Sequence, residues 1–434
     1  MPRRFRVLAD IEPLRRSAAY RRLWAGTTVS SIGGSLTNFA VILQVYRLTH
    51  SSFAVGALGL AQVVPVLAVG LLAGSLTDAV DRRRLTLVTG GVLSLVSVAL
   101  AVQAFAGLRV VGLLYALVAV QSAVAAIDWP ARAALVPSLL PEGQRTAGLA
   151  LTRFSFQLTL VVGPALAGVI TAAPHLGLRA CYLADAVSFL AALYAISRLP
   201  ALPPQRAARP GLRAAAEGAG FIRRSQPLAG AFITDLNATV FGLPIALFPA
   251  INAERFGGSP RTLGLFTAAI GVGGLASAVL SGPLRHLARP GRAMLVTVAL
   301  WGAAFAGFAV ASALWLTLAL LAVAGAADMF TVVFRGAILQ EVTPEPLRGR
   351  VMAADYVVGA GGSHLGNLEA GTLGSLTTPA ISALAGGLTT VAGALIIGVL
   401  LPGFRRYRWT GHRAGADQSS APDSNGPSEP AASR

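Results

Sequence analysis

Three carboxylic acids, Asp128, Asp235 and Asp328, lie inside long apolar stretches of the sequence, where proton chemistry is possible. A charge placed in such a stretch costs free energy, so ionisable residues there are functional candidates by default. Burial favours the neutral form of a carboxyl group, so such a residue can take up and release a proton. Asp235 has no arginine near it in the sequence. We therefore expect Asp235 to be the leading proton-coupling candidate, with Asp328 and Asp128 behind it.

Each of these acids also has an ordinary structural explanation. Asp128 and Arg132 are four residues apart and can form an ion pair along one helix. Asp328 can pair with Arg335 or with a neighbouring segment. Both explanations stay open at this point, because sequence distance does not show which helices meet.

Other polar residues inside the apolar stretches are candidates for lining a cavity or for helix packing. The cavity candidates are Arg153, Asn38 and Asn237. Asp185, Glu369 and His364 are more typical of packing or of the mouth of a cavity. The sequence thus predicts few charged groups in the interior, and each is a candidate for function or for packing.

Enzymatic and metal chemistry find no support in the residue pattern. The five histidines are scattered, and H-E-x-x-H is absent. The single cysteine, Cys181, cannot form an internal disulfide. All 35 basic residues are arginine, so a phosphate-binding loop with its lysine cannot exist. We expect no metal, no cofactor, no direct use of ATP and no enzyme activity.

The elements that carry these residues are predicted to be membrane-spanning helices. Hydrophobic residues make up 54% of the chain and charged residues 12%, and the mean hydropathy is +0.66. A spanning helix needs about 20 mainly apolar residues. Twelve segments qualify, at 23–47, 53–77, 85–106, 110–131, 147–171, 178–198, 228–251, 261–284, 293–311, 314–337, 350–373 and 380–402. The predicted fold class is an all-α membrane protein with twelve transmembrane helices.

The distribution of arginine predicts the orientation. With the N-terminus in the cytoplasm, cytoplasmic segments hold 29 arginines and the opposite side five. Positive residues favour the cytoplasmic side, so both termini are predicted to be cytoplasmic, in a bacterial cytoplasmic membrane. The net charge of +17 is spread over loops instead of being gathered on one face, which argues against a nucleic-acid partner. The expected environment is a lipid bilayer.

An internal repeat divides the chain into halves. "RAALVPSLLPEGQR" from Arg132 and "RGAILQEVTPEPLR" from Arg335 align without gaps at an offset of 203 residues. The Pro- and Arg-rich stretch between the sixth and seventh segments reads as a linker that ends in a short amphipathic helix. The predicted parts are an N-terminal segment 1–22, a six-helix bundle 23–198, a linker 199–226, a second six-helix bundle 227–403 and a largely disordered tail 404–434.

The charged loop "GSLTDAVDRRR" carries a family resemblance. Two pseudo-symmetric six-helix bundles with this loop between the second and third helices resemble the major facilitator superfamily, whose signature there is G-x-L-x-D-R-x-G-R-K/R. The matching residues are Gly74, Leu76, Asp78, Arg82 and Arg83, while Ala79 and Asp81 depart from the pattern. The resemblance implies a cytoplasmic gate in which Asp78 meets the region of Arg350 and Arg132. A loop that only sets topology is the alternative.

Other stretches resemble the siderophore (enterobactin) exporter branch and the macrolide and multidrug exporters of that superfamily. They include "LTHSSFAVG" at 48–56, "ARPGRAMLV" at 288–296 and "LQEVTPEPLRGRV" at 339–351. The fifth segment contains "VVGPALAG", whose Gly163, Pro164 and Gly168 match the exporter motif of that helix. In the family, helices one, four, seven and ten line the central cavity, which places Asp128, Asp235 and Asp328 at it.

The resemblance implies a secondary transporter that exports a small amphiphilic, siderophore-like molecule by alternating access and proton antiport. A macrolide or multidrug exporter is the nearest alternative, and a non-transporting scaffold or receptor is the alternative of a different class. The expected partners are a siderophore-like or drug-like small molecule, protons and lipid. By the habit of the family the protein is expected to be a monomer.

Overall fold

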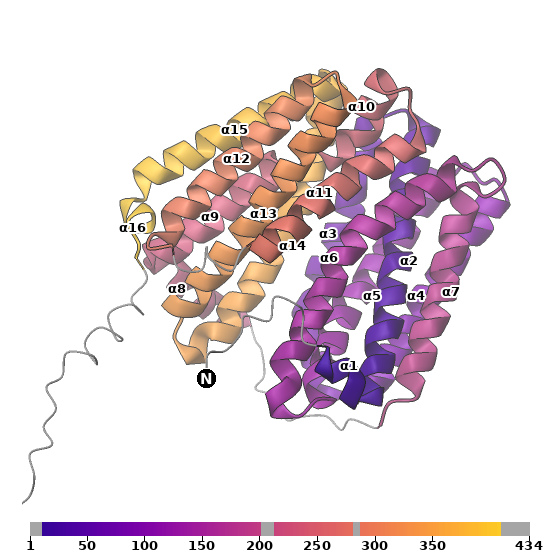
Figure 1. Cartoon of the computed structure of the whole chain (residues 1–434), viewed down its shortest axis with the longest axis horizontal. Helices are drawn as coiled ribbons and strands as arrows, with labels where there is room; N and C mark the ends of the chain where they lie inside the picture. Colours follow the sequence, from indigo (N-terminus) through magenta and orange to yellow (C-terminus); the bar gives the residue numbers. More distant parts are fainter. Residues whose placement is uncertain (1–10, 201–211, 281–286, 409–434) are drawn as a thin grey trace, which may run out of the picture.

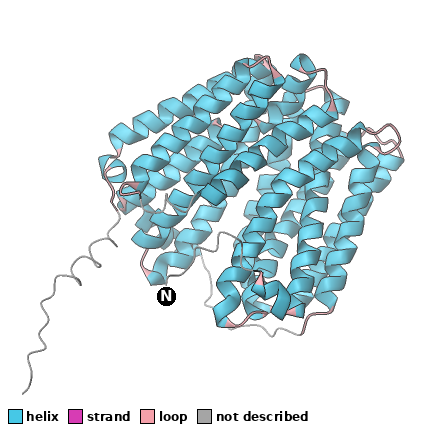
Figure 2. Ribbon diagram, in the orientation of Figure 1, coloured by secondary structure: helices cyan, strands magenta, loops and turns pink. Residues whose placement is uncertain are grey.

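The computed structural model describes residues 11–200, 212–280 and 287–408, and these are helical with no strand among them (Figure 2). The first half holds α1 (Glu12–Arg16), α2 (Ala18–Thr49), α3 (Ser52–Ala79), α4 (Arg82–Phe105), α5 (Val111–Ser138), α6 (Glu142–Ala172) and α7 (Gly177–Ser197). After them come α8 (Leu212–Arg224), α9 (Gln226–Phe241), η1 (Ile245–Leu247), α10 (Phe248–Arg255), α11 (Pro260–Leu280), α12 (Pro290–Val310), α13 (Leu314–Val342), α14 (Glu345–Leu376), α15 (Pro379–Leu400) and α16 (Pro402–Arg405).

Eleven of the twelve predicted segments each overlap one long helix, and the seventh, at 228–251, overlaps α9, η1 and α10, which confirms the predicted fold class. Among the described residues, 11 helices are long and apolar enough to cross a membrane. The remaining predicted segment, 350–373, lies in α14, which is 32 residues long but less apolar. Asp355, His364 and Glu369 lower its hydropathy. A less apolar helix of this length is tolerated where neighbouring helices cover it, and α14 packs against α3, α9 and α15.

Two groups of helices stand side by side (Figure 1). We call α1 to α7 the N-half and α9 to α16 the C-half, and α8 precedes the C-half. The halves meet mainly through two helix pairs, α3 with α14 and α6 with α11, and more weakly through η1 with α3 and α10 with α2. Parts of the predicted terminal segments and linker, at 1–10, 201–211 and 409–434, lie outside the described residues. The amphipathic segment predicted at the end of the linker is α8.

The contacts between the halves lie near one end of the bundle. We call the end with α1, α8 and α16 the terminal face, and the opposite end the distal face (Figure 1). A Cβ atom at Gly371 of α14 would lie 3.0 Å from Cα of Gly56 in α3, and one at Gly264 of α11 would lie 3.0 Å from Cα of Gly168 in α6. Only glycine allows backbones to approach so closely. These four glycines hold the halves together near the distal face, while the ribbons diverge toward the terminal face.

The segment predicted as one continuous helix at 228–251 is interrupted. It consists of α9, a break at Gly242 to Pro244, then η1 and α10. Proline lacks an N–H group and disrupts a helix, so the break leaves backbone groups without partners. Side chains of other helices supply them. Trp301 Nε1 donates to the Gly242 oxygen at 2.7 Å, and the Ala246 N–H donates to Asn367 Oδ1 at 3.0 Å. Where a membrane helix is interrupted, its free backbone N–H and C=O groups need such hydrogen bonds from neighbouring helices.

Candidate functional site

The C-half brings two acids and one arginine from three helices into contact. Arg335 of α13 forms an ion pair with Asp235 of α9, and its Nε lies 3.1 Å from Oδ1 of Asp355 in α14. The side chains of Arg335 and Asp235 are 12% and 7% exposed, and that of Asp355 is 24% exposed. A guanidinium can bind two carboxylates through its fork of N–H donors. Arg335 thereby ties α9, α13 and α14 together.

Glycines of α14 position the acids of this cluster. A Cβ at Gly362 would lie 2.3 Å from the hydroxyl of Thr239, and one at Gly366 would lie 2.1 Å from the Thr239 carbonyl oxygen. Any larger residue at either place would push α9 away. One turn after Asp355, a Cβ at Gly359 would be 3.9 Å from Arg335 Nη2. The small residues thus bring α9 within reach of α14 and leave room for the guanidinium.

A third acid, Asp328, lies seven residues before Arg335 on α13, and therefore on the same face of that helix. It is close enough to Asp235 and Arg335 for electrostatic interaction with both. We call Asp235, Asp328, Arg335 and Asp355 the C-half charge cluster. Its three carboxyl groups and one guanidinium leave a surplus of negative charge whenever two or more carboxyl groups are ionised.

The sequence identified part of this cluster. Asp235 and Asp328 were predicted as proton-coupling candidates, and Arg335 was known only as a member of the repeat and as a possible partner of Asp328. In the structure the ion pairs of Arg335 are instead with Asp235 and Asp355. Asp355 was missed, although an acid within a predicted span is the same signal that selected the others.

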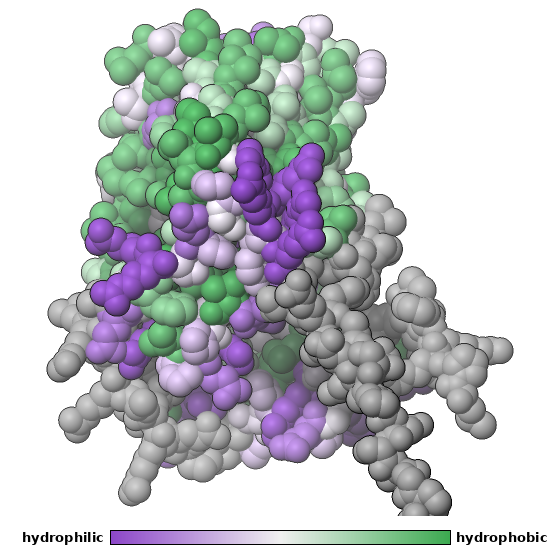
Figure 3. Space-filling view, turned by 90° about the vertical axis from the view of Figure 1, so that its left-hand side faces the viewer, coloured by the Kyte–Doolittle hydropathy of each residue, from purple (hydrophilic) through white to green (hydrophobic). Residues whose placement is uncertain are grey.

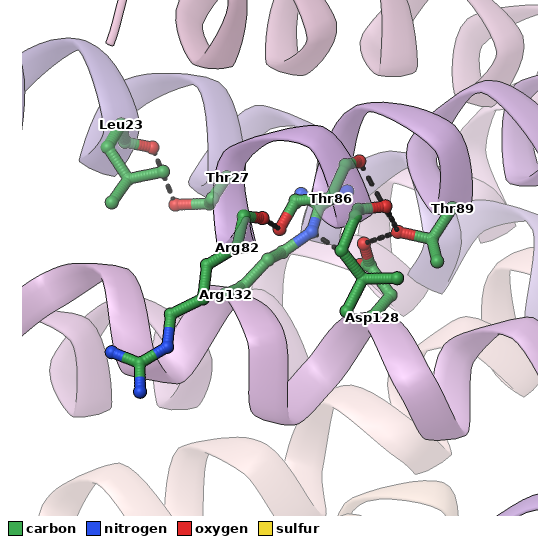
Figure 4. Close-up of polar contacts among 8 residues, drawn as sticks. Leu23, Thr27, Arg82, Thr86, Thr89, Asp128 and Arg132 are labelled. Atoms are coloured by element: carbon green, nitrogen blue, oxygen red, sulfur yellow. Dashed lines mark hydrogen bonds and ion pairs between the residues drawn. The ribbon is translucent and has the colours of Figure 1, made fainter. Parts of the chain in front are cut away.

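The corresponding region of the N-half holds a smaller polar group (Figure 4). Asp128 and Arg132 of α5 form the predicted ion pair along one helix, with side chains 9% and 14% exposed. The Thr89 hydroxyl of α4 donates to Asp128 Oδ1 at 2.6 Å. This arrangement joins α4 to α5 at the level of Gly90, where a Cβ would lie 3.5 Å from Arg132 Nη2. Asp128 thus has a packing role in the structure.

Two further polar groups hold the N-half together. Asp185 of α7 is fully buried, and its Oδ2 accepts hydrogen bonds from Thr37 and Ser97, each at 2.7 Å. Deeper toward the distal face, the amides of Gln44 and Gln103 bond each other at 3.1 Å. These contacts link α2, α4 and α7, in agreement with the packing role expected for Asp185.

The remaining cavity candidates differ in their surroundings. Arg153 of α6 is exposed. Asn38 of α2 is also exposed, as is Ser31 two turns before it, and a Cβ at Gly34 between them would meet no atom within 4 Å. One face of α2 is therefore polar and open. Asn237 instead donates from Nδ2 to the Thr390 oxygen of α15 at 2.9 Å, which is a packing contact within the C-half.

The gate residues predicted from the charged loop are described in part. Gly74, Leu76 and Asp78 lie in the last turns of α3, and their side chains are outside the described residues. Arg82 begins α4, which Asp81 caps by accepting hydrogen bonds from the N–H groups of Arg83 and Arg84. The guanidinium of Arg83 donates to the Ser197 oxygen of α7.

Arg132 and Arg350, the two residues that the resemblance places near Asp78, both have other partners. Arg132 pairs with Asp128 of its own helix, and Arg350 of α14 pairs with Glu217 of α8. A Cβ at Gly218, next to Glu217, would lie 3.1 Å from the Arg350 side chain, so α8 rests directly on the start of α14.

The glycines of the fifth segment pack closely against neighbouring helices. A Cβ at Gly163 would lie 2.2 Å from the Ser35 hydroxyl of α2, and one at Gly168 would lie 2.8 Å from the Pro260 oxygen at the start of α11. Pro164 lies inside α6, and its carbonyl oxygen faces Gly264. This helix therefore makes close contacts both with its own half and with the C-half. Within the described residues, no group of His, Cys, Asp and Glu forms a metal-binding cluster.

Comparison with known proteins decides the family. A family model described as "Transmembrane secretion effector" (MFS_3) matches residues 9–411. The chain belongs to this family. The match confirms the resemblance to the major facilitator superfamily, and it identifies a multi-pass membrane transporter and not an enzyme.

Relatives of known function match over nearly the whole length. The enterobactin exporter EntS of Shigella boydii serotype 18 is 29% identical over 419 residues, which cover 95% of this chain and 99% of that protein. The enterobactin exporter EntS of Citrobacter koseri is 28% identical over 404 residues, covering 92% and 96%. The similarity therefore includes both halves.

Solved structures share the fold. The nucleoside transporter NupG has a TM-score of 0.69 at 13% identity, covering 88% of this chain and 98% of that one. A POT family transporter in complex with 5-aminolevulinic acid has a TM-score of 0.71 at 10% identity, covering 89% and 97%. At these identities the likeness concerns the arrangement of helices alone.

Proposed function

We propose that this transporter exports a small amphiphilic, siderophore-like molecule across the bacterial inner membrane in exchange for protons, as a monomer with both termini in the cytoplasm. The C-half charge cluster is the observation that carries the proton part of the proposal. The EntS relatives support the export direction and the siderophore class, and the arginine distribution supports the orientation.

The surplus of negative charge in the cluster favours the binding of a proton. Three carboxyl groups lie near one guanidinium, which pairs with two of them, and Asp235 is buried. A buried charge without a partner is costly, so a surplus of negative charge is relieved most simply by a proton. Since Asp355 is partly exposed while Asp235 is buried, Arg335 spans the boundary between an accessible carboxylate and a buried one.

The helices of the cluster suit it to coupling. In alternating access, one half rocks against the other around a fixed site. Asp355 and the glycines that face α3 belong to one helix, α14. A change in the pairing of Arg335 with Asp355 is therefore transmitted along α14 to the contact between the halves. Protonation of an acid frees Arg335 for its other partner, and that exchange biases the position of α14.

The gate at the terminal face fits the same cycle. With the halves in contact near the distal face, Arg350 is held by Glu217 and Arg132 by Asp128. In the opposite state, Arg350 and Arg132 are proposed to leave these partners and to meet the end of α3 that carries Asp78. The substrate path runs between the halves and passes the open polar face of α2 with Asn38 and Ser31, with Arg153 on α6 nearby.

The experiment that tests this function is transport into inside-out vesicles with an acid-inside gradient. The compounds offered are a catecholate siderophore, a macrolide and a fluorescent amphiphilic dye. Wild type is expected to accumulate the siderophore only while the gradient lasts. Asp235→Asn, which keeps the shape but cannot carry the proton, is expected to lose gradient-driven accumulation.

The matched control is Glu142→Gln, which neutralises an acid at the start of α6 whose side chain is 90% exposed. It is expected to transport as wild type does. Accumulation that is unchanged in Asp235→Asn would refute the coupling role of the cluster at that residue. Preference for the macrolide would move the protein to the drug-exporting branch, and no gradient dependence with any compound would refute proton antiport.

A further inference from the structure

Four arginines gather at the terminal face of the C-half, and no described carboxylate pairs with them. Arg289 and Arg292 lie at the start of α12, Arg405 ends α16 and Arg406 follows it, and together they line a cavity of about 360 Å³. None of the four forms an ion pair with a residue that the structure describes. Figure 3 shows hydrophilic side chains gathered on this side of the molecule, below a hydrophobic surface.

Packing of one aromatic residue fixes the arginines relative to each other. Phe404 is fully buried directly before Arg405. A Cβ at Gly291 of α12 would lie 2.1 Å from the Phe404 oxygen, and one at Gly230 of α9 would lie 2.3 Å from the Phe404 ring. α16 is thereby pressed against the start of α12. The backbone positions that carry the arginines are held in place before any ligand arrives, which lowers the entropic cost of binding one.

An apolar cavity of about 530 Å³ continues from the arginine site. Arg289 and Arg292 belong to the lining of both cavities, and the rest of the second lining includes Val296 of α12 with Phe330 and Phe334 of α13. The volume is that of an ordinary small-molecule site. A ligand that enters both cavities must therefore carry negative charge at one end and hydrocarbon at the other.

The position of the two cavities matches the edge of a bilayer. Val296 and Leu300 of α12 are 60% and 47% exposed, and Val399 and Leu400 at the end of α15 are 71% and 69% exposed. Exposed apolar side chains in spanning helices face lipid. The arginines lie where this apolar surface ends, which is the level of the phosphate groups of a leaflet.

We propose that this site binds an anionic phospholipid. The phosphate lies among Arg289, Arg292, Arg405 and Arg406, and one acyl chain enters the cavity between α12 and α13. A free phosphate would leave the apolar cavity empty, and a nucleic acid has no hydrocarbon chain to fill it. The bound lipid bridges α12 and α16, and so stabilises the terminal face of the C-half independently of what the protein transports.

The test measures binding of phosphatidylglycerol with a fluorescent acyl chain to the full-length protein in a neutral detergent. A basic residue near a membrane surface changes anionic-lipid binding by about fivefold. The double substitution Arg289→Gln/Arg405→Gln is therefore expected to raise the dissociation constant about 25-fold. Val296→Trp, which fills the apolar cavity and keeps all four arginines, is also expected to weaken binding.

Controls separate this site from general basicity and from phosphate binding. Arg15→Gln/Arg22→Gln removes two exposed arginines from the terminal face of the N-half and is expected to leave binding unchanged. Phosphatidylcholine is expected to compete poorly, and so is inorganic phosphate. Equal weakening in the two double variants would overturn the proposal, as would inorganic phosphate competing as well as phosphatidylglycerol or Val296→Trp binding like wild type.

Discussion

Removing the guanidinium of Arg335 tests the central ion-pair arrangement most directly. Arg335→Gln leaves Asp235, whose side chain is 7% exposed, without its cation, and it also removes the contact with Asp355. Breaking a buried pair by deleting one partner costs about 3–5 kcal/mol, because the remaining charge stays buried. Units of 150–250 residues lose about 2–4 °C in Tm for each kcal/mol. The C-half is of that size, so the expected fall in its Tm is about 6–20 °C.

The assay is thermal unfolding of the purified protein in detergent, followed by tryptophan fluorescence. A second variant, Arg335→Gln/Asp235→Asn, removes both charges of the pair. It is expected to recover most of the lost stability, since an amide at position 235 needs no cation, while gradient-driven transport stays absent. The two variants thereby separate stability from proton coupling. Only the stability is restored when the buried charge is neutralised.

The matched control is Arg145→Gln, which breaks a pair with Glu142 whose side chains are 46% and 90% exposed. Exposed pairs contribute about 0–1 kcal/mol, so the Tm is expected to change little. If Arg335→Gln unfolds at the wild-type temperature, Asp235 does not depend on Arg335, and the reasoning fails. It fails equally if the double variant is less stable than the single one.

Three further outcomes follow from the packing. Gly371→Val is expected to impair transport, because a Cβ there lies 2.5 Å from a backbone oxygen of α3 and keeps the halves from closing near the distal face. Trp301→Phe removes the hydrogen bond to the Gly242 carbonyl oxygen, which accepts no other hydrogen bond from the described residues. The substitution is expected to lower the free energy of unfolding by about 1–3 kcal/mol in thermal unfolding. Burial and the nearby Glu341 carboxylate raise the pKa of Tyr407 to about 12, so its phenolate absorbance is expected to appear only near that pH and earlier in Glu341→Gln. Since the unfolded chain ionises this phenol near pH 10, the stabilisation from the neutral form is present below pH 10 and is lost as the pH rises toward 12.

The spans were predictable because their signal is local. Hydropathy over about 20 residues is decided by the residues of one segment, whatever it packs against. The same reasoning did not find the break in the seventh segment. A glycine and a proline there are compatible with a bent helix as well as with a broken one, and the outcome depends on Trp301 and Asn367, which come from other helices. Hydrogen bonds between backbone groups and side chains of distant helices have no sequence signature.

The pairing of acids was predictable only within one helix. Asp128 and Arg132 are four residues apart, so the two side chains meet once the helix forms. Asp235, Arg335 and Asp355 come from three helices that are brought together by glycines of α14. Their contact depends on helix order and rotation in the bundle, which no local pattern specifies. The sequence therefore predicted Asp235 to be an acid without a nearby arginine, and it predicted Arg335 to be a possible partner of Asp328.

The two halves use their buried acids differently, and this difference limits where coupling can occur. In the N-half, Asp185 receives two hydroxyl hydrogen bonds, and Asp128 has one arginine and one threonine, so each acid is matched to its own donors. In the C-half, Asp235 and Asp355 both pair with Arg335, and Asp328 lies within electrostatic reach of that group. We propose that acids which share a cation exchange it, and that a proton decides which of them keeps it. In the proposed cycle, proton coupling is therefore assigned to the C-half, whose helix α14 also contacts α3 of the other half.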